Sequence, residues 1–148
     1  MSASAPPTSP VGHASGDALL ALRPAIAGQP APIPTPATVA DFQHQVLRPI
    51  LKLQHAVLLA TVADFAHDYR LPLATTAPTE ATRLLTELLA RNTRLRATLA
   101  GLAIGMLTQP ELAFFRQHRA ELTRRLLDLA EQRVRTSLPE LLMCLPTA

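Results

Sequence analysis

Two basic side chains and two histidines share one face of a predicted helix. Arg48 and Lys52, the only lysine of the chain, lie four residues apart, and His44 and His55 fall on the same side at 100° per residue. Guanidinium and ammonium groups bind phosphate and carboxylate groups. The stripe is therefore a candidate anion-binding or partner-binding site. The alternative is the solvated face of an edge helix.

Two further arginines, Arg119 and Arg133, fall within the apolar arc of the last predicted helix. A buried arginine without a partner is costly, so each needs a carboxylate, a helix C-terminus, another subunit or a bound anion. Asp64 and Asp68 are candidate carboxylate partners. The alternative is that both side chains extend outward from the rim of the arc. Arg119 and Arg133 join the candidate anion or partner site.

Two glutamines and two glycines also stand out by position. Gln43 and Gln54 fall on the apolar side of the first helical element, where buried amides need partners, so we expect core hydrogen bonds for both. Gly101 and Gly105 share one face of a later helix, and small residues four apart let helix backbones approach closely. We expect this face to pack within the domain or across a homodimer interface.

The spacing Asp-x-x-His occurs twice, within a near-repeat of Thr-Val-Ala-Asp-Phe-x-His. It places two metal-ligating groups on one helical face each time, Asp41 with His44 and Asp64 with His67. Dimetal helical bundles use Glu-x-x-His in this way but need two further inward glutamates. The predicted fourth helix carries no acidic residue. These four side chains are secondary metal candidates, and chance similarity in a sequence rich in Ala and Leu is the alternative.

Composition predicts an all-α fold and few catalytic options. Aromatic residues make up 3% of the chain, so Leu and Ala, which favour helices, must fill the core. The single cysteine, Cys144, excludes an internal disulfide and a cysteine-based zinc site. Neither a Gly-rich phosphate loop nor a Gly-x-Ser-x-Gly motif is present. No signal-peptide pattern and no apolar run of ~20 residues appear, which predicts a cytoplasmic protein without a membrane span.

Proline usage divides the chain. Eight of the 14 prolines precede residue 37, which predicts a Pro/Ala-rich disordered tail over residues 1–37, with an apolar patch at Ala18–Ala27 that could dock on the domain. Residues 38–148 are predicted to form a bundle of four to five helices. The first is interrupted by Pro49, either as a kink or as the start of a second helix. The expected ranges are about 39–69, 78–90, 93–106 (apolar nearly all round and therefore central), 109–137 and 140–145.

Several motifs resemble a family of small uncharacterised bacterial all-helical proteins. They are Phe42-Gln43, Leu47-Arg-Pro-Ile-Leu-Lys-Leu-Gln54, Arg94-Leu-Arg96, Leu99, Gly101, Ile104-Gly105, Thr108, Glu111 and Arg124-Arg125. The resemblance covers most of residues 42–135 and implies a helical fold. Some relatives carry a glyoxalase label. Glyoxalases of the usual type are built from βαβββ units, and no strand pattern occurs here, so that activity does not transfer.

The preferred interpretation is a non-enzymatic interaction or regulatory module, without a cofactor, that uses the Arg48/Lys52 face or the Gly101/Gly105 face. The first alternative is nucleic-acid or anion binding through arginine-rich helices, although interspersed acidic residues oppose it. The second is a metal-dependent enzyme, glyoxalase-like or dimetal. The arginines of the first alternative are Arg83, Arg91, Arg94 and Arg96, or Arg116, Arg124 and Arg135.

Overall fold

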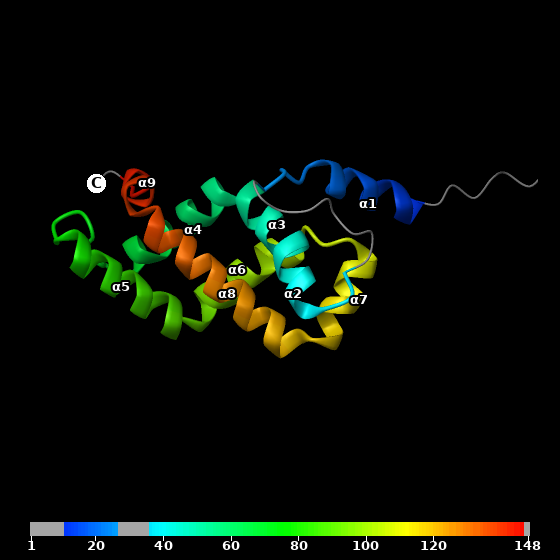
Figure 1. The fold of residues 1–148 in the computed structure, drawn as a ribbon. Coiled ribbons are helices and arrows are strands. Elements are labelled where there is room, and N and C mark those ends of the chain that lie inside the picture. The colour runs from blue at the N-terminus through cyan, green and yellow to red at the C-terminus, as the bar shows by residue number, and fades with distance from the viewer. Residues whose placement is uncertain (1–10, 27–35, 147–148) are drawn as a thin grey trace, which may run out of the picture.

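The computed structural model describes residues 11–26 and 36–146, and over these ranges the chain forms helices and loops without a strand (Figure 1). The all-α prediction is confirmed. Residues 1–10 and 27–35 of the predicted tail lie outside the described ranges. The helices are α1 (Val11–Ala21), α2 (Val39–Phe42), the π-helical turn η1 (Gln43–Leu47), α3 (Arg48–Leu53), α4 (His55–Asp68), α5 (Pro78–Arg91), α6 (Thr93–Ile104), α7 (Gln109–Gln117), α8 (Arg119–Thr136) and α9 (Leu138–Met143).

The first long element passes through Pro49 and changes direction at Gln54. A proline lacks the N–H of a helical turn, and its ring crowds the carbonyl four residues earlier. The wider turn η1 accommodates Pro49, because the Arg48 N–H donates to the Gln43 carbonyl five residues back. The arms on either side of Gln54 are bent by 69°. The kink expected at Pro49 is therefore wrong by five residues, whereas the alternative of a second helix starting there agrees within one residue, because α3 begins at Arg48 with Pro49 in its first turn.

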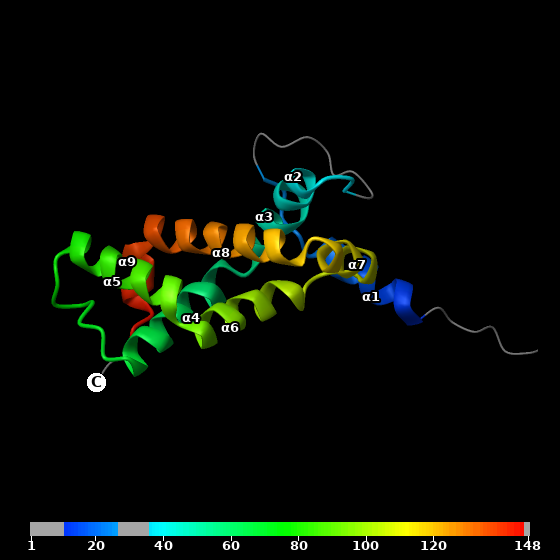
Figure 2. The same ribbon diagram turned by 90° about the horizontal axis from the view of Figure 1, so that it is seen from below.

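One apolar core joins all helices from α2 to α9. The helix α8 packs against η1, α5, α6 and α7, and α9 packs against α4. Figure 2 shows α6 and α8 running side by side, with α5 and α9 toward one end and α7 and α1 toward the other. Each of the eight α-helices from α2 contributes a buried side chain: Phe42, Ile50, Leu59, Leu85, Leu95, Phe115, Leu126 and Leu141.

Two predicted helices differ from the structure. The helix α6 buries Leu95, Leu99 and Ala103 on one face, but Gly101 on the other face is exposed, so α6 is not the enclosed centre of the bundle. The predicted helix over 109–137 is two helices, because the backbone leaves the helical region at His118. Its predicted start is confirmed: the Thr108 and Glu111 side chains form the capping box.

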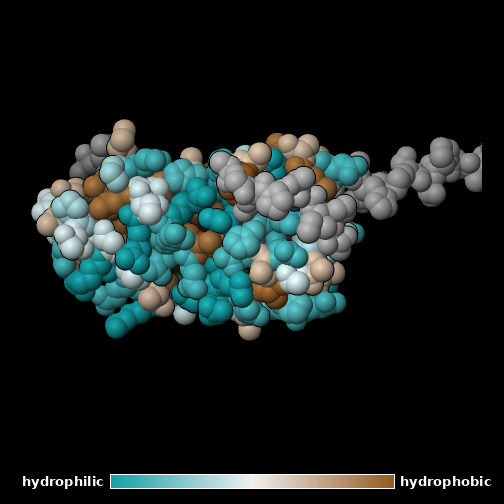
Figure 3. Space-filling view, viewed as in Figure 1, coloured by the Kyte–Doolittle hydropathy of each residue, from teal (hydrophilic) through white to brown (hydrophobic). Residues whose placement is uncertain are grey.

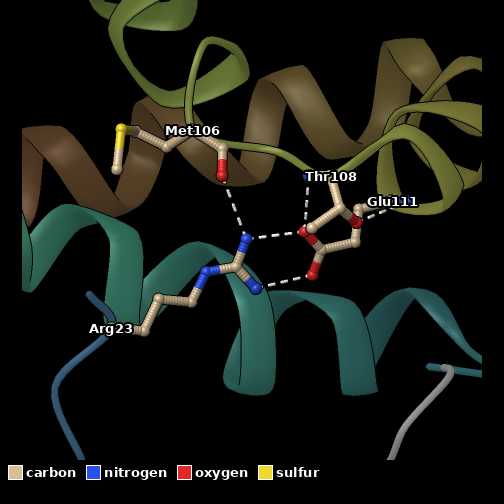
Figure 4. Close-up of polar contacts among 4 residues, drawn as sticks. All are labelled: Arg23, Met106, Thr108 and Glu111. Carbon is tan, nitrogen blue, oxygen red and sulfur yellow. Dashed lines mark hydrogen bonds and ion pairs between the residues drawn. The ribbon is translucent and has the colours of Figure 1, made fainter. Parts of the chain in front are cut away.

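The N-terminal segment is fastened to the domain by a buried ion pair (Figure 4). The Arg23 guanidinium donates to both carboxylate oxygens of Glu111, at 2.6 Å each, and to the Met106 carbonyl at 3.0 Å. Only 8% and 9% of the Arg23 and Glu111 side chains are exposed. The segment allowed to dock at Ala18–Ala27 does so as far as it is described, to Ile26, but through Arg23 and not as an apolar patch, because Leu20 and Leu22 are 48% and 56% exposed. The segment from Gly16 to Ile26 belongs to the folded structure and not to a disordered tail.

The carboxylate of Glu111 holds three structural elements together. Burial by itself would raise its pKa, but the hydrogen bonds from Arg23 and from the Thr108 backbone N–H outweigh burial and hold the pKa below its ordinary value. Because the folded-state pKa is lowered, the ionised carboxylate stabilises the fold above the unfolded-state pKa. That contribution is lost as the pH falls through the folded-state pKa.

We therefore expect Arg23→Ala to lower the free energy of unfolding by about 3 kcal/mol at pH 7, the low end for breaking a buried pair, because the Thr108 N–H still satisfies one oxygen of Glu111. The matched control is Arg83→Ala, whose ion pairs with Glu80 and Glu87 are exposed to solvent and should contribute far less to stability. Urea unfolding measures both.

The difference between wild type and Arg23→Ala should shrink as the pH is lowered through the acid range in which Glu111 becomes protonated. If Arg23→Ala lowers the free energy of unfolding at pH 7 by no more than Arg83→Ala does, this ion pair is not a main attachment of the N-terminal segment.

The end of α4 carries backbone strain at Arg70. The Leu71 N–H donates to Ala66 and the Arg70 N–H to His67, which is the Schellman arrangement, and it leaves Arg70 at φ 56°. Glycine adopts this conformation without a Cβ penalty. We expect Arg70→Gly to raise the free energy of unfolding by up to about 1 kcal/mol. Arg124→Gly, at an exposed position inside α8, should lower it by about 1 kcal/mol. If Arg70→Gly and Arg124→Gly lower the midpoint of thermal unfolding equally, Arg70 is not strained.

Candidate anion-binding site

A pocket of about 240 Å³ lies between α3 and α8. Arg48 enters it from α3 and Arg133 from α8, so two guanidinium groups from separate helices share one cavity. No aspartate or glutamate is among its lining residues. The remaining lining residues are Leu51, Leu129, Gln132, Thr136 and Ser137. We refer to this cavity as the Arg48–Arg133 pocket.

Local helix geometry explains why the two arginines converge. The adjacent residues Pro49, Ile50 and Leu51 of α3 are buried, and so is Val134 next to Arg133 on α8. Burying these apolar faces leaves each arginine at the margin of the contact, half-buried, with its polar end directed along the seam between the helices. The face of the molecule crossed by α8 is mainly hydrophilic in Figure 3.

Arg133 is held by a histidine and, through it, by a distant carboxylate. Its Nη1 lies 3.2 Å from His55 Nδ1, and His55 Nε2 lies 2.9 Å from Glu140 Oε2. A guanidinium has only donors. The network therefore assigns Nδ1 as the acceptor and places the hydrogen on Nε2, which donates to Glu140. The Glu140 carboxylate is therefore separated from Arg133 by the imidazole ring of His55.

Arg48 is held in a similar but looser way. Its Nη1 lies 3.4 Å from Nδ1 of His44, one helical turn earlier. Over the described residues, no ion pair joins either Arg48 or Arg133 to a carboxylate. Burial lowers the pKa of Arg133, and the positive charge of Arg48 lowers it further. Both effects disfavour a cation at this position, and a bound anion would oppose both.

The predicted site residues divide into two groups. Arg48 and Arg133 line the pocket, whereas His44 and His55 lie outside its lining and contact it through Arg48 and Arg133, respectively. Lys52 is exposed and donates to the Ala25 carbonyl at 2.9 Å, away from the pocket lining.

Arg119 also lies elsewhere. It is exposed at the start of α8, fourteen positions before Arg133, which is about 21 Å along a helix. The outward alternative is correct for Arg119. Asp64 and Asp68 are both exposed, and among the described residues neither forms an ion pair with Arg119 or Arg133.

Four contributors to the site were not predicted: Gln132, Thr136, Ser137 and Glu140. Thr136 and Ser137 follow Arg133 by three and four residues, so helical spacing places them beside it. That spacing becomes informative only once α3 is known to pack at this point on α8. Glu140 belongs to α9, and no local pattern connects it with His55.

Most arginines of α5 and α8 pair with acidic residues of their own helix, whereas Arg94, Arg96 and Arg116 have no ion pair among the described residues. Most of these pairs are spaced by three or four positions and are exposed to solvent. They are Arg83 with Glu80 and Glu87, Arg91 with Glu87, Arg124 with Asp128, Arg125 with Glu121 and Arg135 with Glu131. Arg94 lies 5.8 Å from the centre of the Phe65 ring. This pairing leaves the Arg48–Arg133 pocket as a place where positive charge is concentrated without acid.

The metal candidates are not assembled into a site. His44, Asp64 and His67 are exposed, and the Asp41 backbone N–H donates to the hydroxyl of Thr38, the residue that caps the start of α2. Across residues 11–26 and 36–146, no group of three or more His, Cys, Asp and Glu side chains is placed to hold a metal ion.

The glycine face is open within the chain. A Cβ added at Gly101 would meet nothing within 4 Å, and one at Gly105 would meet only backbone oxygens of its own helix, the nearest at 3.3 Å. The expected close packing within the domain is therefore wrong for Gly101. A homodimer contact through this face stays a prediction.

Both predicted core glutamines have hydrogen bonds. Gln54 Nε2 donates to the Leu102 carbonyl at 2.9 Å, which ties the bend to α6. Gln43 Oε1 accepts from Arg125 Nη1 at 2.7 Å, which ties η1 to α8. The expectation of structural hydrogen bonds for these amides is confirmed, and both are only half-buried.

No protein-family model, curated protein or solved structure matches this chain. Among the described residues, no single helix has both the length and the apolarity to cross a membrane. The bent pair Val39–Leu53 and His55–Asp68 meets those criteria only when the two arms are taken together.

An unmatched pair of cations should cost stability. We expect Arg48→Met, which keeps the apolar stem and removes the charge, to leave the free energy of unfolding unchanged or to raise it by up to about 1 kcal/mol. The difference should shrink with added salt. The control Arg125→Met removes contacts with Gln43 and Glu121 and should lower stability by about 1 kcal/mol. A larger loss for Arg48→Met than for Arg125→Met would contradict this view of the pocket.

Proposed function

We propose that this protein is a non-enzymatic interaction or regulatory module whose Arg48–Arg133 pocket binds an anionic group, a phosphoryl or carboxylate, of a partner. The observation that carries the proposal is the convergence of two arginines from different helices in a cavity that no carboxylate lines. Guanidinium groups match the oxygen geometry of both anions.

The expected strength of the pocket suits recognition of one group on a larger partner. Two charge-assisted contacts at about 1.5–3 kcal/mol each give about 3–6 kcal/mol. That range corresponds to a Kd between about 6 mM and about 40 μM for an isolated anion, with 1 mM at about 4 kcal/mol. A free anion would therefore occupy the site weakly, and further contacts with a partner would have to supply the rest of the affinity.

The hydrogen bonds around the pocket support binding and not catalysis. Both ring nitrogens of His55 are engaged, one with Arg133 and the other with Glu140. The Thr136 hydroxyl lies 3.0 Å from the Gln132 carbonyl and 3.2 Å from the Arg133 carbonyl, both on its own helix. A general base or nucleophile needs such groups directed at a reacting atom. Here they position an arginine and close a helical turn.

The proposal keeps the cytoplasmic location expected from the sequence, and it is compatible with a homodimer through the open Gly101 face. Nucleic-acid binding is the less favoured alternative, because the arginines outside the pocket are mostly paired with acids. The metal-dependent alternative lacks a ligand cluster within the described residues.

Titration calorimetry with inorganic phosphate at constant ionic strength tests the proposal. We expect a Kd of about 1 mM for the wild-type protein. Arg48→Ala and Arg133→Ala should each weaken binding about tenfold or more, since each removes one charge-assisted contact. Arg119→Ala is the matched control, because Arg119 is an exposed arginine on α8 outside the pocket.

Three results together would support the proposal: the wild-type protein binds phosphate, Arg119→Ala changes the Kd by no more than about twofold, and both pocket variants bind phosphate more weakly. Equal losses in all three variants would indicate general electrostatic attraction and overturn it. The proposal is also overturned if the wild-type protein binds no phosphate at concentrations well above the expected Kd.

A further inference from the structure

A second hollow adjoins the Arg48–Arg133 pocket along α8. It measures about 330 Å³ and is lined by Gln43, Arg124, Arg125, Asp128, Leu129 and Gln132. Leu129 and Gln132 line both hollows. The two therefore form one groove along α8, bordered by η1 and α3 on the opposite side. We call it the α8 groove.

The length of the α8 groove sets the size of what it can hold. The lining residues on this helix run from Arg124 to Ser137. Within that run, Arg125 and Arg133 are eight positions apart, which is about 12 Å at 1.5 Å per residue. An extended peptide rises about 3.3 Å per residue, so the stretch between these two arginines matches about four residues of extended chain.

The two ends of the groove carry different charge. At one end, neither Arg48 nor Arg133 has a carboxylate partner in the described part of the chain. At the other end Arg124 lies 3.5 Å from Asp128, and Arg125 lies 2.9 Å from Glu121. The groove therefore presents positive charge at one end and a neutralised surface at the other, which favours an occupant with a single anionic group.

The middle of the groove combines apolar and amide groups. Leu51 and Leu129 supply apolar surface. Gln43 uses its Oε1 to accept from Arg125, and within the described residues its amide NH₂ group has no partner. The exposed side chain of Gln132 lies between the two hollows. Glutamine amides both donate and accept, as the peptide backbone does.

We infer that the α8 groove binds an extended peptide segment of a partner protein, about four residues long, with one phosphorylated or acidic side chain in the Arg48–Arg133 pocket. This inference rests on the anion-binding function proposed above and names the class of partner. Gln43 and Gln132 contact the backbone of the segment, and Leu51 and Leu129 contact its apolar atoms.

A nucleic-acid strand fits the same groove poorly. Each nucleotide carries a phosphate, so a strand that filled the Arg48–Arg133 pocket would bring further phosphates toward Asp128 and Glu121. None of the residues lining either hollow is aromatic, which removes the base-stacking contacts of single-strand binding.

Fluorescence-polarisation competition with the full-length protein tests the inference. The probes are capped tetrapeptides of three alanines and one phosphoserine at either end, the same peptides with serine or aspartate, capped phosphoserine alone, and a single-stranded oligothymidine. We expect one phosphoserine peptide to bind about 25-fold more tightly than capped phosphoserine, because two added hydrogen bonds are each worth about a factor of five. The serine peptide should not bind.

Gln132→Ala should weaken the phosphoserine peptide about fivefold and leave the affinity for inorganic phosphate unchanged. Gln43→Ala should also weaken binding of the phosphoserine peptide. Because Gln43 accepts a hydrogen bond from Arg125, this variant is informative only if its circular dichroism spectrum and unfolding curve match those of the wild-type protein. Gln117→Ala, an exposed glutamine at the end of α7, is the control and should change neither affinity. The aspartate peptide distinguishes an acidic from a phosphorylated source of the anion.

Equal affinities for the peptides and for capped phosphoserine would overturn the peptide inference while the anion-binding function stands. Tighter binding of the oligothymidine than of either phosphoserine peptide would also overturn it, in favour of nucleic acid. Failure of inorganic phosphate to bind would remove the anion-binding function and this inference together.

Discussion

The change of direction at Gln54 is the constraint on which the site depends. It separates α3 from α4 by a 69° bend, and the Gln54 amide fastens the bend to the Leu102 carbonyl of α6. Arg48 lies before the bend and meets Arg133 on α8, whereas His55 lies immediately after it and links Arg133 to Glu140 on α9. In a straight helix, residues seven apart would point the same way and could not approach Arg133 from two sides.

The pocket is a local departure from the charge matching seen over the rest of the described chain. A buried or half-buried arginine elsewhere has an acid or a carbonyl: Arg23 has Glu111 and Met106, and Arg96 has the Leu89 carbonyl at the end of α5. Arg48 and Arg133 have imidazoles, which orient a guanidinium without cancelling its charge. Such a pair lowers stability unless an anion arrives, and unmatched groups of this kind are typical of sites kept for binding.

The parts of the fold that follow from local pattern were predictable. The helix over Pro78–Arg91, the Thr108–Glu111 capping box and the short helix after Ser137 each carry their signal within a few residues. The bend was misplaced, because proline is the usual cause of a break and the π-turn that accommodates Pro49 has no sequence signature. The break at His118 and the docking of Arg23 depend on packing between distant segments, and hydrophobic periodicity contains no information on either.

The same distinction explains which arginines could be assigned a role from sequence. Those that pair with an acid three or four residues away, such as Arg83 with Glu80, are recognisable from spacing alone. Arg133 has an acid at i−2, Glu131, but residues two apart on a helix do not face each other, and Glu131 pairs with Arg135 instead. Arg48 has no acid within a helical turn in either direction. A half-buried arginine that local spacing leaves unmatched must find its partner across the fold or outside the chain, and for Arg48 and Arg133 the described residues supply only histidines.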